Sequence, residues 1–325
     1  MIKRLGRTTN RKYSRNSTGK SIQVDLNLTL EEMFERFISF KQTEGLQERT
    51  LNDYYMHFTM LMDYIGKDIT RDEITENLFL DYSAYMIHER GLAPHTVNLR
   101  IRTMRAFIRY CFKEGWIDYP IHEKFKPIKV EEDTLESLTP SELKILFSVV
   151  DTSTYAGFRD LVMLHVLLDT MVRISELLAM KRENVDLKAG LIKLEASGTK
   201  KKKYRYVPLS SKTIKLLQQY IAESADFNEE ALFLTYDGRE MNDHTFRDKM
   251  REYGELAGIK NKRVSPHTLR HSGALLYILN GGDPFSLQKI LGHADMSMVR
   301  KYIQMTDTDV KRQHNQFSPL KSVFK

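Results

Sequence analysis

The chain has 325 residues, 41% of them hydrophobic, which is enough apolar surface for two domains with separate cores. Its formal charge of +7 and pI of about 9.2 favour a polyanionic partner. The single cysteine, Cys111, excludes a disulfide framework and a cysteine-rich zinc site. We find no apolar leader and no run long enough to span a membrane, so we expect a protein of the cytoplasm.

Residues 1–24 contain seven lysines and arginines and no acidic residue. This composition offers too little apolar surface for independent folding, so we predict a disordered basic arm. The arm is either a solubilising tail or a contact to phosphates, and we favour the second.

Residues 25–118 are predicted to form a bundle of four helices. Thr29 and Glu32 form a capping box at the start of the first helix. The other three are expected over about 49–65, 75–90 and 94–113, where Gly91 and Gly115 follow the last two.

The fourth of these helices has two stripes of different character. Its apolar stripe should face the core of the bundle and comprises Val97, Ile101, Met104, Ile108 and Cys111. A second stripe, about 100° away, contains Asn98, Arg102 and Arg105. These side chains suit a major groove or its flanking phosphates, and the alternative is an ordinary solvated basic face.

Residues 138–325 are predicted to form a domain that contains both helices and strands, after a polar linker at 119–137. Helices are expected from the capping box at Thr139, over about 157–170, in the RISELLAM segment, and again after Ser210. Between them, a small antiparallel sheet is predicted from segments near 184–187, 191–194 and 204–209, with lysines 200–203 in its loop. The fold class is therefore mainly α with a small antiparallel β-sheet (α+β).

The segment from Ser265 to Tyr302 concentrates polar groups at interpretable spacings. Ser265 and Pro266 begin a helix on which His267 and Arg270 share a face. Asp283 begins the next helix, which Gly292 ends, so that His293 follows its C-terminus and Tyr302 comes nine residues later. Upstream, Arg173 follows the long apolar helix, with Glu176 three residues on.

Strand cleavage without a metal needs a covalent nucleophile, donors to the phosphate oxygens and an acid for the leaving oxygen. Tyrosine can be the nucleophile if cations or a base activate it, and arginine clamps phosphate with two parallel hydrogen bonds. Each residue also has an ordinary structural explanation: Arg173 could pair with Glu176, His293 could contact a helix end, and Tyr302 could be core.

Taken together, these segments resemble the tyrosine recombinases of the phage-integrase family. The matching pieces are RISEL around Arg173, the loop lysine before KYRYVPL, HTLRHS, LGH at 291–293 and the tyrosine nine residues later. They follow the family order, and residues 25–118 resemble the family's core-binding domain. Two positions depart from the pattern: Met171 and Thr199 stand where the family usually has glycine.

The resemblance implies a role for each site residue. Arg173 and Arg270 would clamp the scissile phosphate, and Tyr302 would attack it to give a 3′-phosphotyrosyl link. Lys200, with Lys201 as the alternative, would protonate the leaving 5′ oxygen. His267 would assist proton transfer near the tyrosine, His293 would bind a phosphate oxygen, and Glu176 would orient Arg173.

The resemblance also implies partners and a biological setting. Family members act without cofactor, metal or ATP as homotetramers on paired double-stranded DNA sites, with accessory DNA-bending factors as further partners. Residues 303–325 would pass to a neighbouring subunit. The expected function is integration, transposition or other site-specific recombination for a mobile element, in the nucleoid. A type IB topoisomerase and a catalytically silent DNA-binding regulator are the alternatives.

Overall fold

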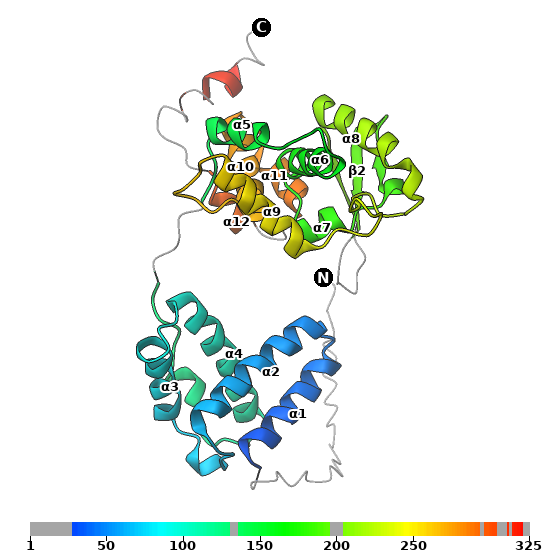
Figure 1. The fold of residues 1–325 in the computed structure, drawn as a ribbon. Coiled ribbons are helices and arrows are strands. Elements are labelled where there is room, and N and C mark those ends of the chain that lie inside the picture. The colour runs from blue at the N-terminus through cyan, green and yellow to red at the C-terminus, as the bar shows by residue number, and fades with distance from the viewer. Residues whose placement is uncertain are drawn as a thin grey trace, which may run out of the picture. The chain divides into compact units, whose positions relative to one another are not determined.

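The computed structural model describes residues 28–130, 136–195, 204–292, 296–303, 311 and 314–320. The chain divides into two compact units, Met1–Glu132 and Asp133–Lys325 (Figure 1). We call them the helical unit and, after the role that the resemblance implies for it, the catalytic unit. The predicted arm, residues 1–24, lies outside the described residues.

The helical unit contains the four predicted helices: α1 (Leu30–Thr43), α2 (Glu48–Ile65), α3 (Glu76–His88) and α4 (Pro94–Lys113). Thr29 and Glu32 form the predicted capping box, and Gly66 ends α2 in the left-handed conformation. The core is rich in aromatic rings: Phe34 stacks on Phe58 with 3.7 Å between ring centroids and meets Phe107 edge to face. The apolar stripe of α4 faces this core, as predicted.

The first part of the predicted linker belongs to the helical unit. A short 3₁₀ helix, η2 (Ile121–Glu123), packs against α4, and both Ile121 and Phe125 are buried in the aromatic core. Phe125 stacks on Phe79 with 4.4 Å between ring centroids. The packed structure therefore continues past the predicted end at residue 118.

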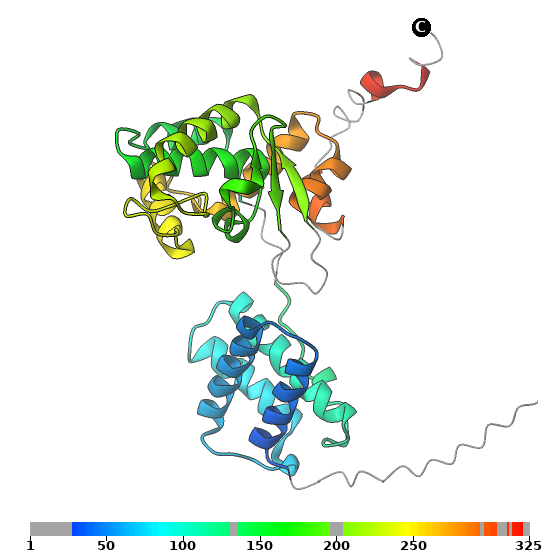
Figure 2. The same cartoon turned by 90° about the vertical axis from the view of Figure 1, so that its right-hand side faces the viewer.

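The catalytic unit surrounds a small antiparallel sheet with helices. Its strands pair in the order β1 (Val185–Asp186), β2 (Leu191–Leu194) and β3 (Arg205–Pro208). The helices are α5 (Pro140–Ser148), α6 (Tyr155–Thr170), α7 (Ile174–Leu178), α8 (Ser211–Glu223), α9 (Asp243–Leu256), α10 (Pro266–Leu279), α11 (Pro284–Leu291) and α12 (Ser297–Arg300). Figure 2 shows β3 beside α11, so the sheet and the C-terminal helices are direct neighbours.

Two buried helices, α6 and α10, pack closely at the centre of the catalytic unit. The close approach depends on Gly273 of α10, because a Cβ there would lie 2.6 Å from the carbonyl oxygen of Leu168. Met171 ends α6 with φ of 52°, a conformation that strains a non-glycine residue by about 1–2 kcal/mol. Its buried side chain packs against Gly273, so the methionine that departs from the expected glycine at this position is accommodated within the tight packing.

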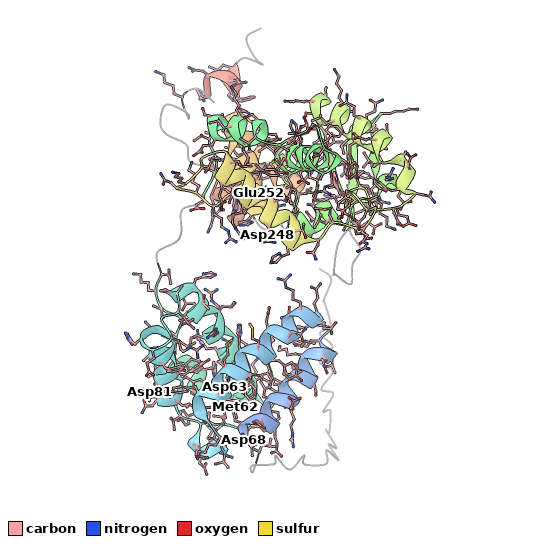
Figure 3. All side chains as sticks on the ribbon, viewed as in Figure 1. Met62, Asp63, Asp68, Asp81, Asp248 and Glu252 are labelled. Carbon is pink, nitrogen blue, oxygen red and sulfur yellow. The ribbon has the colours of Figure 1, made fainter. Side chains whose placement is uncertain are left out.

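The outer face of α9 carries ion pairs. Asp248 pairs with His244 and Arg251, and Glu252 pairs with Lys249. Figure 3 labels Asp248 and Glu252 on this helix. All of these side chains are more than a third exposed, so each pair adds at most about 1 kcal/mol to stability. Across the described ranges, no helix is both long and apolar enough to cross a membrane.

Candidate active site

Arg270 is the buried centre of the site. It lies in the second turn of α10, which begins as predicted with Ser265 as N-cap and Pro266 in the first turn. Its guanidinium donates to the carbonyl oxygens of Met171, at 2.5 Å, and Leu291, at 3.0 Å. Both carbonyls lie at helix C-termini, where partial negative charge favours a cation. The ends of α6 and α11 thus hold the arginine in place.

Arg173 and Glu176 are joined in the first turn of α7. Glu176 accepts a bond of 2.8 Å from the backbone N–H of Arg173 and one of 3.2 Å from its guanidinium. The Glu176 side chain is 8% exposed, whereas that of Arg173 is 47% exposed. A buried carboxylate therefore fixes an arginine that keeps an open face for an anion.

Arg205 of β3 completes this arrangement, although the sequence motifs did not single it out. It donates two bonds of 2.8 Å to the two carboxylate oxygens of Glu176 and a third, of 3.0 Å, to the carbonyl oxygen of Ile290. Gly292 has φ of 67°, which strains any other residue, and a Cβ there would lie 2.9 Å from the guanidinium carbon of Arg205 and would displace it. Arg205 thus links α7, β3 and the end of α11.

Tyr302 is buried, 3% exposed, directly after α12. Its phenol contacts Nδ1 of His271, and Nε2 of His271 lies 2.7 Å from Nε2 of His267. The two histidines are four residues apart on α10 and therefore share a helical face. The described residues thus form a continuous path from the phenol through His271 to His267.

Burial and neighbouring charges shift the pKa values of the residues along and beside this path. Burial raises the pKa of Tyr302, and the nearby Arg270 opposes that rise. Burial, assisted by Arg270 and Arg247, lowers the pKa of His267, which is therefore neutral at neutral pH. Burial and the charge of Arg173 lower the pKa of Arg270 to about 10, so this guanidinium still carries its charge.

Glu176 remains ionised although it is buried. Burial alone would raise its pKa, but the hydrogen bonds from Arg205 and from the Arg173 backbone outweigh burial and lower it. Three guanidinium groups, those of Arg173, Arg205 and Arg270, thus act around one carboxylate. The excess of positive charge suits a phosphate diester.

The structure brings together the predicted residues Arg173, Glu176, His267, Arg270 and Tyr302 within one unit. Lys200, its alternative Lys201, and His293 lie outside the described residues. Among those that are described, no group of three or more histidine, cysteine, aspartate or glutamate side chains could hold a metal ion.

The predicted DNA-binding stripe of α4 is only partly exposed. Asn98 is 4% exposed, and its amide donates to the Ile128 carbonyl oxygen at 2.8 Å and accepts from the Ile128 N–H at 2.6 Å. Asn98 therefore fastens the segment after η2, and its prediction as a DNA contact is corrected. Arg105 is half-buried and donates to the carbonyl oxygen of His122, whereas Arg102 is exposed.

Two residues of the site were missed from the sequence, His271 and Arg205. A signal existed for each: His271 follows Arg270 directly and repeats the helical face of His267, and Arg205 alternates with outward-facing tyrosines on a strand. Neither signal alone separates a functional side chain from an ordinary buried one.

Comparisons with known proteins support the expected family. The model of the phage integrase family matches residues 136–309, and that of the phage integrase SAM-like domain matches residues 25–127. Tyrosine recombinase XerD of Listeria innocua is 28% identical over 300 residues, which cover 89% of this chain and 99% of the relative. XerD of Staphylococcus aureus is 28% identical over 306 residues, with the same coverage.

Solved structures share the fold at lower identity. The Tn1549 transposon integrase in complex with a circular intermediate DNA has a TM-score of 0.72 at 16% identity, covering 88% of this chain and 98% of that one. A lambda integrase dimer bound to a COC′ core site has a TM-score of 0.70 at 17% identity, covering 86% and 80%. The match over more than half of the chain, from residue 136 to 309, shows that this protein belongs to the phage integrase family and is a tyrosine recombinase.

Proposed function

We propose that the protein cuts and rejoins DNA at specific sites through a 3′-phosphotyrosyl link on Tyr302. The observation that carries the proposal is the phenol of Tyr302, held beside His271 and close to the charge of Arg270. A buried phenol with a raised pKa is a poor nucleophile by itself, and a neighbouring base and a cation are the two groups that activate it.

The arginines bind the scissile phosphate in this proposal. Arg173 offers an exposed guanidinium, and Arg270 offers a buried one that two helix ends hold rigid. Pre-positioned cations of this kind stabilise the charge that develops on a phosphate during transfer. Glu176 takes no part in the chemistry and orients Arg173 through the bonds already described.

Lys200, or Lys201, is proposed to protonate the leaving 5′ oxygen, and His293 to bind a phosphate oxygen. Both roles rest on the resemblance of the surrounding motifs. Energy from the broken ester stays in the phosphotyrosyl link, so resealing by the free 5′ hydroxyl needs no further energy source.

DNA is the proposed partner, with Arg102 of α4 and the basic arm as further phosphate contacts. We propose a homotetramer on two paired sites, because one fold neighbour is a lambda integrase tetramer bound to a Holliday junction. We propose that segment 303–325 passes to a neighbouring subunit. Of its described residues, Phe317 and Leu320 are 65% and 62% exposed, which suits packing on a neighbour. From the sequence alone, we also propose that a mobile element encodes the protein. Sequencing the DNA that flanks the gene tests this.

A covalent trapping experiment tests the function. Duplexes that bind the full-length chain are selected from a random library and rebuilt as suicide substrates, with a nick that lets the short 5′ product leave. We expect wild-type protein to form a denaturation-resistant complex with the selected duplex and Tyr302→Phe to form none. A wild type that binds its duplex but never forms such a complex would contradict the proposal. Relaxation of supercoils without strand exchange between two sites would favour the topoisomerase alternative.

A further inference from the structure

A second histidine separates the nucleophile from the histidine that the family resemblance relates to proton transfer. Nε2 of His267 lies 2.7 Å from Nε2 of His271, and the other ring nitrogen of His271 contacts the phenol of Tyr302. The rings of the two histidines meet edge to face with 4.1 Å between their centroids. His271 therefore lies between the two groups whose proton exchange the reaction needs.

The position of His271 is fixed by the fold. The residue is 5% exposed on α10, the helix that packs closely against α6. Its neighbours on both sides are fixed as well: Arg270 donates to two helix-end carbonyls, and Ser272 accepts a bond of 2.7 Å from the N–H of Leu138. A base that must meet a phenol in one geometry is best placed on such a rigid helix.

We propose that His271 is a catalytic residue that accepts the phenolic proton of Tyr302 as the tyrosine attacks phosphorus. The proposal rests on the function proposed above and assigns the base for its first step. His267 acts behind His271, as the group that orients its ring and shares its second proton.

The proton positions follow from the two contacts. For Nδ1 of His271 to accept, the proton of its neutral ring must be on Nε2, where it donates to Nε2 of His267. During cleavage, the Tyr302 O–H bond breaks, the oxygen forms its bond to phosphorus, and the bond from phosphorus to the 5′ oxygen breaks. The phenolic proton moves to Nδ1, and the leaving oxygen takes a different proton from the general acid. Resealing reverses each transfer, and His271 returns the proton to the phenolate.

The charges that face this pair fit the step. Tyr302 lies against His271 from the segment after α12, and His267 lies against it on α10. Arg270 acts on both Tyr302 and His267, and Arg247 of α9 acts on His267. These cations favour a neutral His267 before cleavage and a developing negative charge on the phenol, and both states suit the transfer.

The test compares pH profiles of single-turnover cleavage on the selected suicide duplex. His271→Asn keeps a polar group near the Nδ1 position but cannot accept a proton at neutral pH. We expect cleavage at pH 7 to fall by roughly 10²–10⁴-fold, the usual contribution of a general base. The remaining rate should rise about tenfold per pH unit, because cleavage by the variant requires a phenol that has already ionised. The wild-type rate should depend less steeply on pH, because its base accepts the proton during the attack. A loss below threefold, or an equal loss at every pH, would overturn the proposal.

Two further measurements separate this role from others. A substrate with sulfur in place of the bridging 5′ oxygen needs no general acid, so it should not restore His271→Asn; full restoration would assign His271 to the leaving group instead. His165→Asn is the matched control, because His165 is a half-buried histidine of α6 bonded to a backbone carbonyl, and it should cleave as wild type does.

If His271→Asn does not melt cooperatively, His271→Ala assayed with added imidazole replaces it. Imidazole should then restore cleavage in a pH-dependent manner. If the variant folds and binds DNA but imidazole does not restore cleavage, the assignment of His271 as the base is wrong. If the proposed function were wrong, wild-type protein would form no covalent complex. That result differs from the one that would contradict the role of His271.

Discussion

Removal of Arg205 should destabilise the catalytic unit and leave the helical unit unchanged. In Arg205→Met, the aliphatic stem is retained and the guanidinium is removed. Glu176, 8% exposed, then loses two charge-assisted bonds of 2.8 Å, and the Ile290 carbonyl loses one of 3.0 Å. Removing a bond to a charged group lowers stability by about 1.5–3 kcal/mol.

The net loss is smaller than the sum of these bonds. Glu176 keeps the backbone N–H of Arg173 at 2.8 Å and its guanidinium at 3.2 Å, so its charge is not left alone. We therefore expect the free energy of unfolding to fall by about 3 kcal/mol. For a unit of this size, the midpoint of thermal unfolding should fall by about 6–12 °C.

The chain carries its own internal control. Its single tryptophan, Trp116, is buried in the core of the helical unit, so tryptophan fluorescence reports that unit alone. In urea unfolding, far-UV circular dichroism should show a destabilised catalytic transition, while the fluorescence transition stays unchanged. A cycle with Glu176→Gln should give a coupling of about 2 kcal/mol. A change below about 0.5 kcal/mol by circular dichroism would refute the reasoning.

The pH dependence of this effect has a definite sign. The folded protein lowers the pKa of Glu176 below its ordinary value of 4.5. The stability that the ion pair contributes is therefore fully present above pH 4.5 and is lost as the pH falls through the folded value. The difference between wild type and Arg205→Met should accordingly shrink in acid, and a difference that grows in acid would contradict the assignment.

Three other outcomes are expected. Arg173→Ala should lower cleavage by roughly 10²–10³-fold while gel-shift affinity stays nearly unchanged, and an equal loss of both would make Arg173 structural. Asn98→Ala should destabilise the helical unit by about 1–3 kcal/mol, measured by tryptophan fluorescence, whereas Arg102→Ala should weaken DNA binding without changing stability. If Asn98→Ala instead weakened DNA binding and left stability unchanged, Asn98 would be a DNA contact after all. Removing residues 1–24 should reduce the slope of log affinity against log salt by roughly 0.9 for each phosphate that the arm neutralises, and an unchanged slope would mark the arm as a tail.

Local chemistry made most of the fold predictable. Capping residues such as Thr29, Thr139 and Ser265 fix where helices begin, and Gly292 fixes where one ends. These signals are encoded within a few residues, so the sequence alone reveals them. The end of the helical unit was harder to predict, because the prolines and charges of 119–130 hide two core residues. Ile121 belongs to η2, which packs against α4, and Phe125 stacks on Phe79.

The site was predictable only where a motif carried it. Arg173, His267, Arg270 and Tyr302 stand in motifs with a family order, and the structure places them in one unit. The contact between His271 and Tyr302 joins residues 31 positions apart and depends on how the segment after α12 packs against α10, which no periodicity encodes. Asn98 lies in the same stripe as the arginines, yet its hydrogen bonds go to Ile128, 30 residues later in the chain.

During cleavage, Tyr302 should become covalently linked to a 3′ phosphate of DNA. Trypsin should cleave the trapped complex after Lys301 and after Lys311, leaving a ten-residue peptide in which Tyr302 is the only tyrosine. After nuclease digestion, mass spectrometry should find that peptide carrying a nucleotide through its 3′ phosphate. A nucleotide on any other peptide, or one attached through its 5′ phosphate, would contradict the account.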